Sequence, residues 1–578
     1  MPENDTATQF VETQLAIHGH LKAERQPYEE FWDNLSGIFA PELLDTTELD
    51  SNGQPGLQFG AEIYDGEPQL CLHKWAKGMV GNMVYDAPWF QMQLNVRQLM
   101  EDDEVRKYCE ARSEQTHYAV KRTNFHSETV QLAKYSGVMG GVMIPIKDAK
   151  RRRMHFFNEH PYCVWYEDDM FGEIQRVHRT IKKPVRVWAD TFGKENLPPD
   201  WRKMADSPQQ ANTIKELLHI TFPNPDYDPT VLANEYQPYA SCYIDVQSKH
   251  LVAREGSTYL PIVWRVARHP RWTYPLTPSM FALTDALTND QLTMALLQAA
   301  RRSGDPRYRV HRNLREQWSE DPGAKMWFER PEELAEQLDT HIRWDIADAQ
   351  WDRITEKLRW WFSVQYFTLL SSLEGPPPTA YHIQQVMGEK STLLGPEVGS
   401  FKRDVLDSVV DIVGSEEESL TGDVVPVPDR LVQFMIERAQ HYAQTNGLDI
   451  NEADLADFAS NNRMAQLDAT YTGVLAQVQR QLAHTRSYMD AIGMMQAGAQ
   501  LMPEMRYVMK PYEMGRGILR QSNIAQDELN TEEEYQAIID TINQSAALQQ
   551  QADREKAGAE SYSKLTKAPE EGSPAEAA

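Results

Sequence analysis

The segment from Thr277 to Gly375 constrains the fold more than any other, because it reads as two long helices separated by a compact insert. Thr277 is suited to cap the first helix, and Pro278 to occupy its first position, where a missing N–H costs nothing. Gly304, followed by Pro306, is expected to end this helix. Its apolar residues recur at helical spacing and are Met280, Leu283, Leu287, Met294 and Leu297.

The second helix is expected to begin near Ile346 and to end before the proline run at 376–378. Each helix would have roughly 25 residues and a length of about 38 Å. Residues 304–345, between the helices, contain a strand-like segment at 308–311. Spacing at i, i+3, i+7 and i+10 predicts that four residues share one face of the second helix, namely Trp351, Ile354, Leu358 and Trp361.

The length and net charge of the chain limit the functions that it can have. The chain has 578 residues, which predicts several domains with room for large cores. It carries 58 basic and 85 acidic residues, a net charge of −27, whereas proteins that grip nucleic acid are usually basic. The four cysteines form no CxxC pair, so we expect buried free thiols in a reducing compartment. Residues 1–10 are polar, unlike a signal peptide, and no apolar run of about 18 residues could span a bilayer.

The fold class is predicted to be α+β, mainly α. Before the helix pair we expect a short lead-in at 1–24 that becomes helical, and then helices at 26–39 and 68–85. From Arg430 to about Gln551 the sequence reads as almost all helix, and residues 553–578 are predicted to be disordered because they hold few apolar groups. Strands are expected at 137–144, 216–222, 240–246, 250–254 and 260–267.

Several short segments between residues 25 and 550 form an ordered series. They are the aromatic helix Tyr28–Leu35, the turn Ile63–Gly66, the block Gly78–Phe90, Asn124–Phe125, the strand Gly137–Ile144, His160–Tyr162, Ala189–Gly193, Asn196–Pro198, Thr379–Ala380 and Leu394–Pro396. This series resembles the head-to-tail connecting proteins, or portal proteins, of short-tailed bacteriophages. His382 departs from the family, which commonly has an acidic residue there, and Tyr274–Pro278 replaces the glycines that usually precede the first long helix.

The resemblance implies a portal fold assembled as a ring, in which the two long helices form a stem around a channel. The implied regions are a lead-in at 1–24, a wing at 25–276, stem helices at 277–303 and 346–372, a clip at 304–345, a second wing segment with a channel loop and a kinked helix at 373–429, a helical crown at 430–552 and a disordered tail at 553–578.

The resemblance also implies a function without catalysis, cofactor or metal. Such a ring, expected to be a dodecamer, sits at one capsid vertex of the virion and is assembled in the host bacterial cytoplasm. The terminase large subunit packages double-stranded DNA through it, the DNA is later ejected, and the tail attaches to it. Further implied partners are the major capsid and scaffolding proteins and a tail adaptor protein, with no membrane. DNA carries one negative charge per ~1.7 Å of helix axis. A strongly basic channel wall would grip it, whereas an acidic wall with a few basic rings would let it slide.

Basic residues are candidates for contacts with DNA in the channel. Lys390, Lys402 and Arg403 flank the helix that Gly395-Pro396 is expected to kink, and Arg301-Arg302 ends the first stem helix. The alternative is that these are solvated helix charges, with the arginine pair favoured by the negative helix end. The channel loop could lie at 373–379 or at 388–397, and the sequence does not choose between them.

The apolar stem residues are predicted to pack within the stem and between subunits, because one chain cannot bury stripes on both sides of two helices. The candidates are Leu283, Leu287, Met294, Trp351, Ile354, Leu358 and Trp361. An alternative use of the aromatic residues is as a stacking platform for single-stranded nucleic acid.

Two other functions stay open. No GxxxxGK[ST], HExxH or GxSxG motif is present. The segment Pro199-Asp200-Trp201-Arg202-Lys203 has the outline of a nuclease element, so one alternative is a soluble, helical, metal-dependent enzyme acting on nucleic acid, with Asp200 and Lys203 in its site. The other is a tail adaptor, which would also form a ring but should lack the helix–insert–helix segment.

Overall fold

The computed structural model divides the chain into two compact units, Met1–Gln479 and Arg480–Ala578, which are treated separately. The described residues are 3–43, 63–84, 88–96, 98–148, 151–228, 234–304, 308–310, 312, 319, 336–337, 344–368, 393–422, 424–446, 467–471, 534–542, 544–545, 549 and 554–557.

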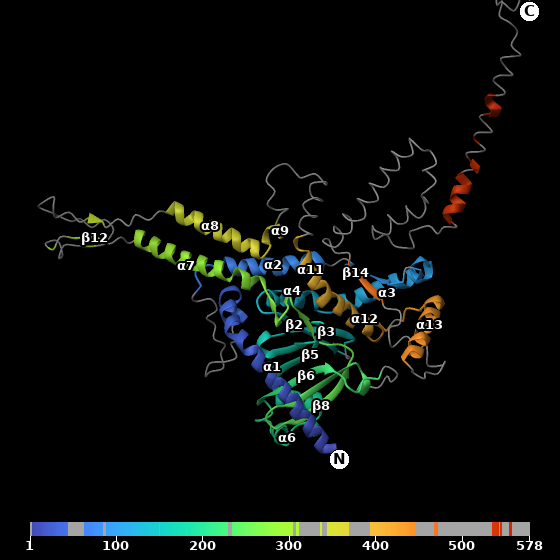
Figure 1. Ribbon diagram of the computed structural model, residues 1–578, viewed down its shortest axis with the longest axis horizontal. Coiled ribbons are helices and arrows are strands. Elements are labelled where there is room, and N and C mark those ends of the chain that lie inside the picture. Colours follow the sequence, from blue (N-terminus) through green and yellow to red (C-terminus); the bar gives the residue numbers. More distant parts are fainter. Residues whose placement is uncertain are drawn as a thin grey trace, which may run out of the picture. The chain divides into compact units, whose positions relative to one another are not determined.

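The N-terminal segment is one long helix, α1, from Glu3 to Phe39, with Pro27 inside it (Figure 1). The lead-in that was expected to become helical and the helix expected at 26–39 are thus one continuous helix. The helix continues toward the N-terminus because its first half is buried against a sheet: Val11 is 1% exposed and packs with Phe222 in a small core cluster. Tertiary contacts thus keep α1 helical on both sides of Pro27, although proline usually ends or kinks a helix.

Five strands form an antiparallel sheet in the order β4-β5-β6-β7-β8, so each strand pairs with its neighbour along the chain. This confirms the expected strands at 216–222, 240–246 and 250–254. The helices α5 (Val185–Phe192) and α6 (Pro199–Asp206) lie between β5 and β6. The bounds are β4 Val164–Asp168, β5 Ile174–Pro184, β6 Ile214–Pro223, β7 Tyr239–Asp245 and β8 His250–Ser257.

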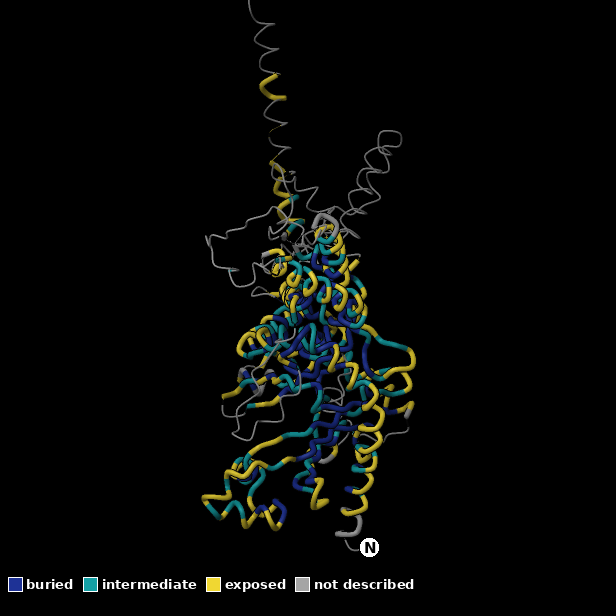
Figure 2. Tube along the Cα trace, turned by 90° about the vertical axis from the view of Figure 1, so that its left-hand side faces the viewer, coloured by how far each residue is buried: buried dark blue, intermediate teal, exposed yellow. Residues whose placement is uncertain are grey.

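A second, three-stranded sheet holds the largest core. Its strands are β3 (Arg153–Glu159), β2 (Gly141–Asp148) and β9 (Ile262–Trp264), in that order. Residues of α2 (Glu67–Met83) and α4 (Phe125–Ser136) share its core cluster. Buried residues gather inside this unit, whereas α1 keeps an exposed outer side (Figure 2).

A strand that the sequence did not predict ties a distant segment to this unit. β14 (Leu467–Tyr471) pairs antiparallel with β1 (Phe90–Leu94), beside α3 (Asp103–Lys121). The strand at 467–471 interrupts a segment, 430–551, that was predicted to be almost all helix, and α13 (Asp429–Asn446) is helical as expected. The reason is a backbone ladder to a strand several hundred residues earlier, which helical periodicity cannot reveal.

The predicted helix pair is present as α7 (Pro278–Gly304) and α8 (Trp344–Trp361), which run side by side (Figure 1). The second helix is shorter than expected, because Ser363 adopts a positive φ of 53° and a separate short helix, α9 (Val364–Thr368), follows.

The helical path is interrupted next to the Gly395-Pro396 pair, where a kink was predicted. Leu393 is helical, Leu394 is not, and α11 (Gly395–Phe401) follows with Pro396 in its first turn, where proline is tolerated. A second departure from α-helical geometry, a π turn at Lys402–Leu406, leads into α12 (Asp407–Thr421).

The remaining elements are short. The strands are β10 (Ala267–His269), β11 (Trp272–Leu276), β12 (Tyr308–Arg309) and β13 (Glu336–Gln337), and the 3-10 turns are Pro41–Leu43, Leu99–Glu101, Pro161–Cys163, Lys194–Asn196 and Asn234–Tyr236. In the second unit, residues 534–542 are helical. Within the tail expected to be disordered, residues 554–557 are helical, and the other residues of 553–578 lie outside the described part. The fold class is confirmed as α+β and mainly helical.

Candidate functional site

The helix pair begins at a strongly held cap. The hydroxyl of Thr277, which is fully buried, donates to the carbonyl of Val138 at 3.1 Å and accepts from the backbone N–H of Met280 at 3.4 Å. Pro278 is the first helical residue, as predicted. The cap therefore satisfies one of the N–H groups left free at a helix start and anchors α7 to the turn before β2.

The face of α7 that is buried in the chain carries small residues. Ala282 and Ala286 are fully buried and share the main core cluster with Leu358 of α8 and with Phe362, which directly follows α8. Small side chains let two helix backbones approach closely, so the pair packs tightly while burying little apolar area of its own.

Polar contacts hold α7 to the turn before α2 and to α8. The Asn289 side-chain amide donates to Asp65 Oδ2 at 2.6 Å, and Asp290 Oδ1 accepts from the backbone N–H of Tyr64 at 2.7 Å. Two bonds link α8 to α7: the Asn289 amide also donates to Thr355 Oγ1 at 3.4 Å, and Trp351 Nε1 donates to Thr293 Oγ1 at 3.2 Å. Because a buried polar group without its partner is costly, these last two bonds oppose sliding of one helix along the other.

The large apolar side chains of the pair lie on its outer surface. Leu287, Met294 and Leu297 of α7 are 44%, 37% and 45% exposed. A second exposed apolar area is formed by Phe281 and Trp361, whose rings stack at a centroid distance of 5.8 Å. At 3.6 residues per turn, Phe281 lies about 140° around α7 from Met294, so the two apolar areas are on different sides of the pair.

The residues predicted for stem packing divide into three groups. Leu287, Met294 and Trp361 are exposed, and Leu283, Trp351 and Ile354 are half-buried. Leu358 is completely buried within its own chain. The single face predicted for α8 is therefore wrong in part, since Thr355, Leu358 and Phe362 point inward while Trp361 does not.

The candidate DNA contacts fall in two separate places. Arg301 and Arg302 are exposed in the last turn of α7, whereas Lys402 and Arg403 are exposed in the π turn (Figure 1). The structure does not bring these two pairs together, and Lys390 lies outside the described residues, as do 373–379 and 388–392 of the two candidate loops.

Both π-turn cations have neighbours. Lys402 Nζ lies 5.0 Å from the ring centroid of Tyr471, and Arg403 Nε donates to Asp404 Oδ1 at 2.8 Å. The hydrogen bond to Asp404 raises the pKa of Arg403.

Sequence reasoning missed the part played by Tyr471. Its hydroxyl donates to Asp407 Oδ1 at 2.5 Å, so β14 is held to the helix that follows the π turn. Burial raises the pKa of both side chains. The alternation in Leu467–Tyr471 was the only available signal, and it is too short to separate a strand from a helical stretch.

The nuclease-like segment does not assemble into a metal site. Asp200 and Lys203 are exposed on the short helix α6. In the part of the chain that the structure describes, no three His, Cys, Asp or Glu side chains come together as potential metal ligands. All four cysteines are free, as predicted: Cys71, Cys109 and Cys242 are buried and Cys163 is partly exposed.

None of the helices among the described residues is long and apolar enough to cross a membrane.

A helix pair that is registered by polar contacts and leaves large apolar side chains uncovered is typical of a structural protein that assembles with further copies. The chain belongs to the bacteriophage head to tail connecting protein family, whose sequence profile matches residues 12–529. A curated relative, the "Probable portal protein" of Bordetella phage BPP-1, is 22% identical over 466 residues, which cover 75% of this chain and 80% of that protein. The predicted resemblance is confirmed: the chain is a phage head-to-tail connector of the portal type and a component of the virion.

Proposed function

We propose that the chain assembles into a closed ring, expected to be a dodecamer, which forms the channel at one capsid vertex. Double-stranded DNA is packaged through this channel by the terminase large subunit and is later ejected through it, and the tail attaches to the ring by an adaptor protein. The major capsid and scaffolding proteins contact it during assembly in the host bacterial cytoplasm. Family membership and the uncovered helix pair support this proposal.

The observation that carries the ring is the exposure of apolar side chains on two sides of the helix pair. A cyclic assembly joins two different surfaces of each subunit, one to each neighbour. The surface of Leu283, Leu287 and Met294 and the surface of Phe281 and Trp361 suit this arrangement, because each would bury area that a single chain leaves in water. Leu358 is omitted from the proposed contact because it is already buried.

We assign the regions with two changes from the sequence-based scheme. The stem is α7 with residues 346–372, the clip is 304–345, and the wing is 25–276 with 373–429. The wing also takes in the rest of α1 and strand β14, because both pack on its sheets. The crown then begins after β14 and ends near 552.

The charge balance suits a channel that conducts DNA. A net charge of −27 opposes general adhesion to phosphate, so contact would be confined to a few basic rings. Lys402 and Arg403 at the π turn and Arg301 and Arg302 at the end of α7 are the described candidates, together with Lys390. We place the channel loop at 373–379 or 388–397.

The test is the native mass of the purified chain with negative-stain images of the same peak. A ring with a central hole and a mass near twelve times 66.4 kDa is expected. A monomer that cleaves DNA in the presence of Mg²⁺, and loses this activity on Asp200→Ala, would overturn the proposal.

A further inference from the structure

The end of the helix pair adopts a backbone conformation that its side chains do not favour. The chain stays helical as far as Phe362, whose N–H donates to the carbonyl of Leu358 at 3.3 Å. Ser363 then has a φ of 53°, in the left-handed region, and the short helix α9 follows and packs on α2 (Figure 1). A residue that ends a helix in this way is usually glycine, because a Cβ disfavours the left-handed region by roughly tenfold.

The sequence around Ser363 contains no residue that would end a helix. Neither glycine nor proline occurs between 344 and 374. The residues on both sides of the bend, in α8 and in α9, are helical. A continuous helix through Thr368 therefore has no local obstacle, and the bend at Ser363 must be maintained by tertiary contacts.

Two apolar side chains of α9 hold the bend. Val364 is 3% exposed and belongs to the main core cluster. Phe367 packs directly over Gly78 of α2, where an added Cβ would clash with its ring. Glycine inside a helix is unfavourable, so its presence in α2 is explained by the space that it leaves for Phe367.

The residue between these two side chains is poorly accommodated. The side-chain nitrogen and oxygen of Gln365 are both buried, and neither has a hydrogen-bond partner among the described residues. A buried amide without partners is costly, and it adds to the cost of the left-handed Ser363. The bent conformation thus combines two favourable apolar contacts with two unfavourable features, which brings it close in free energy to the alternative of a continuous helix.

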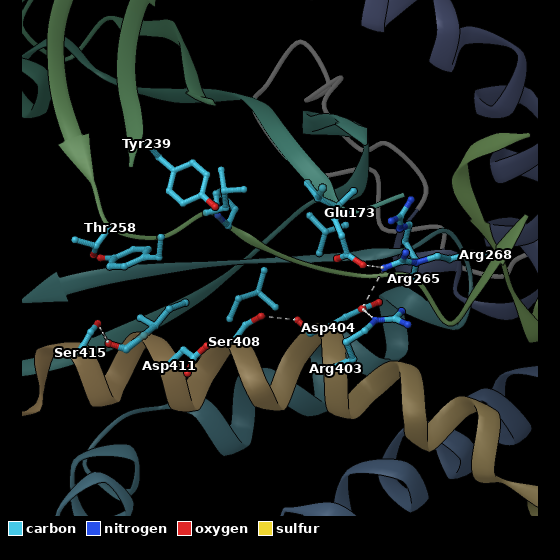
Figure 3. A pocket seen from close by; sticks show the side chains of 17 residues that line it. Glu173, Tyr239, Thr258, Arg265, Arg268, Arg403, Asp404, Ser408, Asp411 and Ser415 are labelled. Atoms are coloured by element: carbon cyan, nitrogen blue, oxygen red, sulfur yellow. Dashed lines mark hydrogen bonds and ion pairs between the residues drawn. The ribbon is translucent and has the colours of Figure 1, made fainter. Parts of the chain in front are cut away.

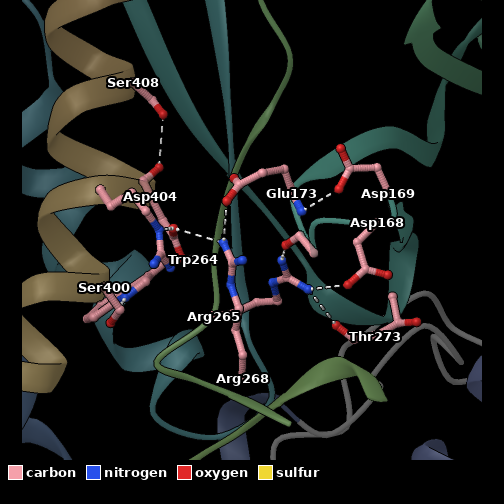
Figure 4. A network of polar contacts seen from close by, with 12 residues as sticks. Asp168, Asp169, Glu173, Trp264, Arg265, Arg268, Thr273, Ser400, Asp404 and Ser408 are labelled. Atoms are coloured by element: carbon pink, nitrogen blue, oxygen red, sulfur yellow. Dashed lines mark hydrogen bonds and ion pairs between the residues drawn. The ribbon is translucent and has the colours of Figure 1, made fainter. Parts of the chain in front are cut away.

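The groove between the π turn with α12 and the segment that joins β8 to β9 shows no comparable imbalance. Arg265 lies 2.8 Å from Asp168, and Arg268 lies 3.3 Å from Glu173 and 3.6 Å from Asp404 (Figure 4). The groove is lined by three arginines and three carboxylates, which are Arg265, Arg268, Arg403, Glu173, Asp404 and Asp411 (Figure 3). Its charges therefore balance.

We propose that residues 362–368 form a hinge with two states. In the bent state, described above, Phe367 lies on Gly78. In the straight state Ser363 is helical and α8 continues through Thr368, so the strain at Ser363 is relieved and the contact with α2 is lost.

The straight state changes the surface of the helix pair. In a continuous helix Trp360, Val364 and Phe367 recur at i, i+4 and i+7 and share one face. Trp360 is already 58% exposed, so Val364 and Phe367 would enlarge an apolar face that a single chain leaves in water. A neighbouring copy of the chain would cover this face, so assembly favours the straight state; this last step rests on the proposed ring.

The test places 4-fluorophenylalanine at position 367 of the full chain and records its fluorine NMR spectrum in dispersed chains. Ser363→Gly is expected to raise the ratio of the bent to the straight state about tenfold, because glycine adopts a positive φ without strain. Ser363→Ala is expected to lower this ratio about twofold, because alanine favours a helix more than serine does.

A matched pair of substitutions in α2 tests the contact with Phe367. Gly78→Ala fills the space under the ring and is expected to move the fluorine signal to the position of the straight state. Gly81→Ala makes the same change three residues later, where nothing lies within 4 Å of the added Cβ, and is expected to leave the spectrum unchanged. Equal effects of the two substitutions, or one signal that neither Gly78→Ala nor the Ser363 variants move or divide, would overturn the hinge.

Hydrogen exchange identifies the second state. A continuous helix protects the backbone amides of residues 364–368 in Gly78→Ala, because each then donates to a carbonyl four residues earlier. Loss of protection at these amides would show a frayed segment instead of a straight helix and would contradict the proposal.

The assembled protein separates this inference from the proposed function. Rings whose fluorine signal lies at the straight-state position support selection by a neighbouring copy. Rings whose signal stays at the bent-state position refute that selection and leave the ring itself standing. If no ring forms, selection by a neighbour fails together with the proposed function, and the spectra of dispersed chains still decide whether the hinge exists.

Discussion

The core around Trp264 and the helix pair use apolar side chains in opposite ways. Trp264 is fully buried, stacks on Trp75 at 5.8 Å and contacts Phe401 at 4.8 Å. In α7, by contrast, the buried apolar side chains are those of Ala282 and Ala286, and larger ones such as Leu287 are exposed. The first region stabilises the single chain, whereas the second leaves apolar area exposed that the proposed ring would bury.

The largest expected effect is the loss of a core aromatic side chain. Trp264→Ala should lower the free energy of unfolding by about 3–5 kcal/mol, because it leaves a cavity among buried rings. Trp360→Ala, at a side chain that is 58% exposed on α8, should change it by less than about 0.5 kcal/mol. Urea denaturation of dispersed chains measures both. Similar losses in the free energy of unfolding for the two variants would show that the two regions do not differ in this way.

Acid should weaken the β-sheet region and spare the helix pair. Burial lowers the pKa of His178 on β5 to about 2, and that of His18, which stacks on it from α1, to about 4. Unfolded imidazoles titrate near pH ~6.5, so below that pH the unfolded chain binds protons that the folded chain excludes. Stability is therefore complete above pH ~6.5, and His178 alone should remove about 2 kcal/mol by pH ~5.

The charged and titratable groups that face this histidine pair come from three elements. They are Lys22 and Arg25 of α1 and Arg176 of β5 itself; His219 of β6 is a further titratable neighbour, whose pKa burial lowers. Neither α7 nor α8 contains a histidine. Urea midpoints at pH 7 and 5 test the prediction, and His178→Leu should flatten the dependence. An unchanged pH dependence in that variant would contradict it.

A smaller effect is expected at the start of the helix pair. Thr277→Ala removes the cap of α7 and leaves the Val138 carbonyl without its donor, and should cost about 1 kcal/mol. Thr288→Ala changes the same residue type at an exposed position inside α7 and should cost less than about 0.5 kcal/mol. Thermal unfolding of dispersed chains compares the two. If Thr288→Ala were the more damaging, the cap would not anchor the helix.

The smallest change in the stability of the single chain is expected for substitutions that prevent assembly of the ring. Leu287→Gln combined with Met294→Gln changes exposed side chains and should alter the free energy of unfolding by less than about 0.5 kcal/mol. The native mass should nevertheless fall from ring to dispersed chain, because the proposed contact loses apolar area. Glu356→Gln, also exposed on the pair, is the control and should assemble normally. A double variant that still forms rings would show that this surface is not the contact.

Local chemistry made much of the fold predictable. Thr277 and Pro278 marked the start of α7, and alternation marked β6, β7 and β8. β14 could not be found this way, because it exists only by pairing with β1. The continuity of α1 through Pro27 likewise depends on the packing of its first half against a sheet.

The sequence identified the apolar candidate residues, but it did not show which of them are buried and which are exposed. Spacing identified apolar residues on α8 but grouped Leu358 with Trp361, which the structure separates into a buried and an exposed position. The break at Ser363 and the π turn at Lys402–Leu406 left no sequence signal of their own.

The sequence by itself determined the resemblance to the connector family, the helix pair and the acidic net charge. The resemblance rests on an ordered series of short segments, and the helix pair follows from caps and periodicity, which depend on residues close together in the chain. The three-dimensional fold decided which side of each helix is buried, where distant strands pair, and how Asp404 comes to lie beside Arg268. Such contacts join residues far apart in sequence, and their free energy exists only once the backbone has brought them together.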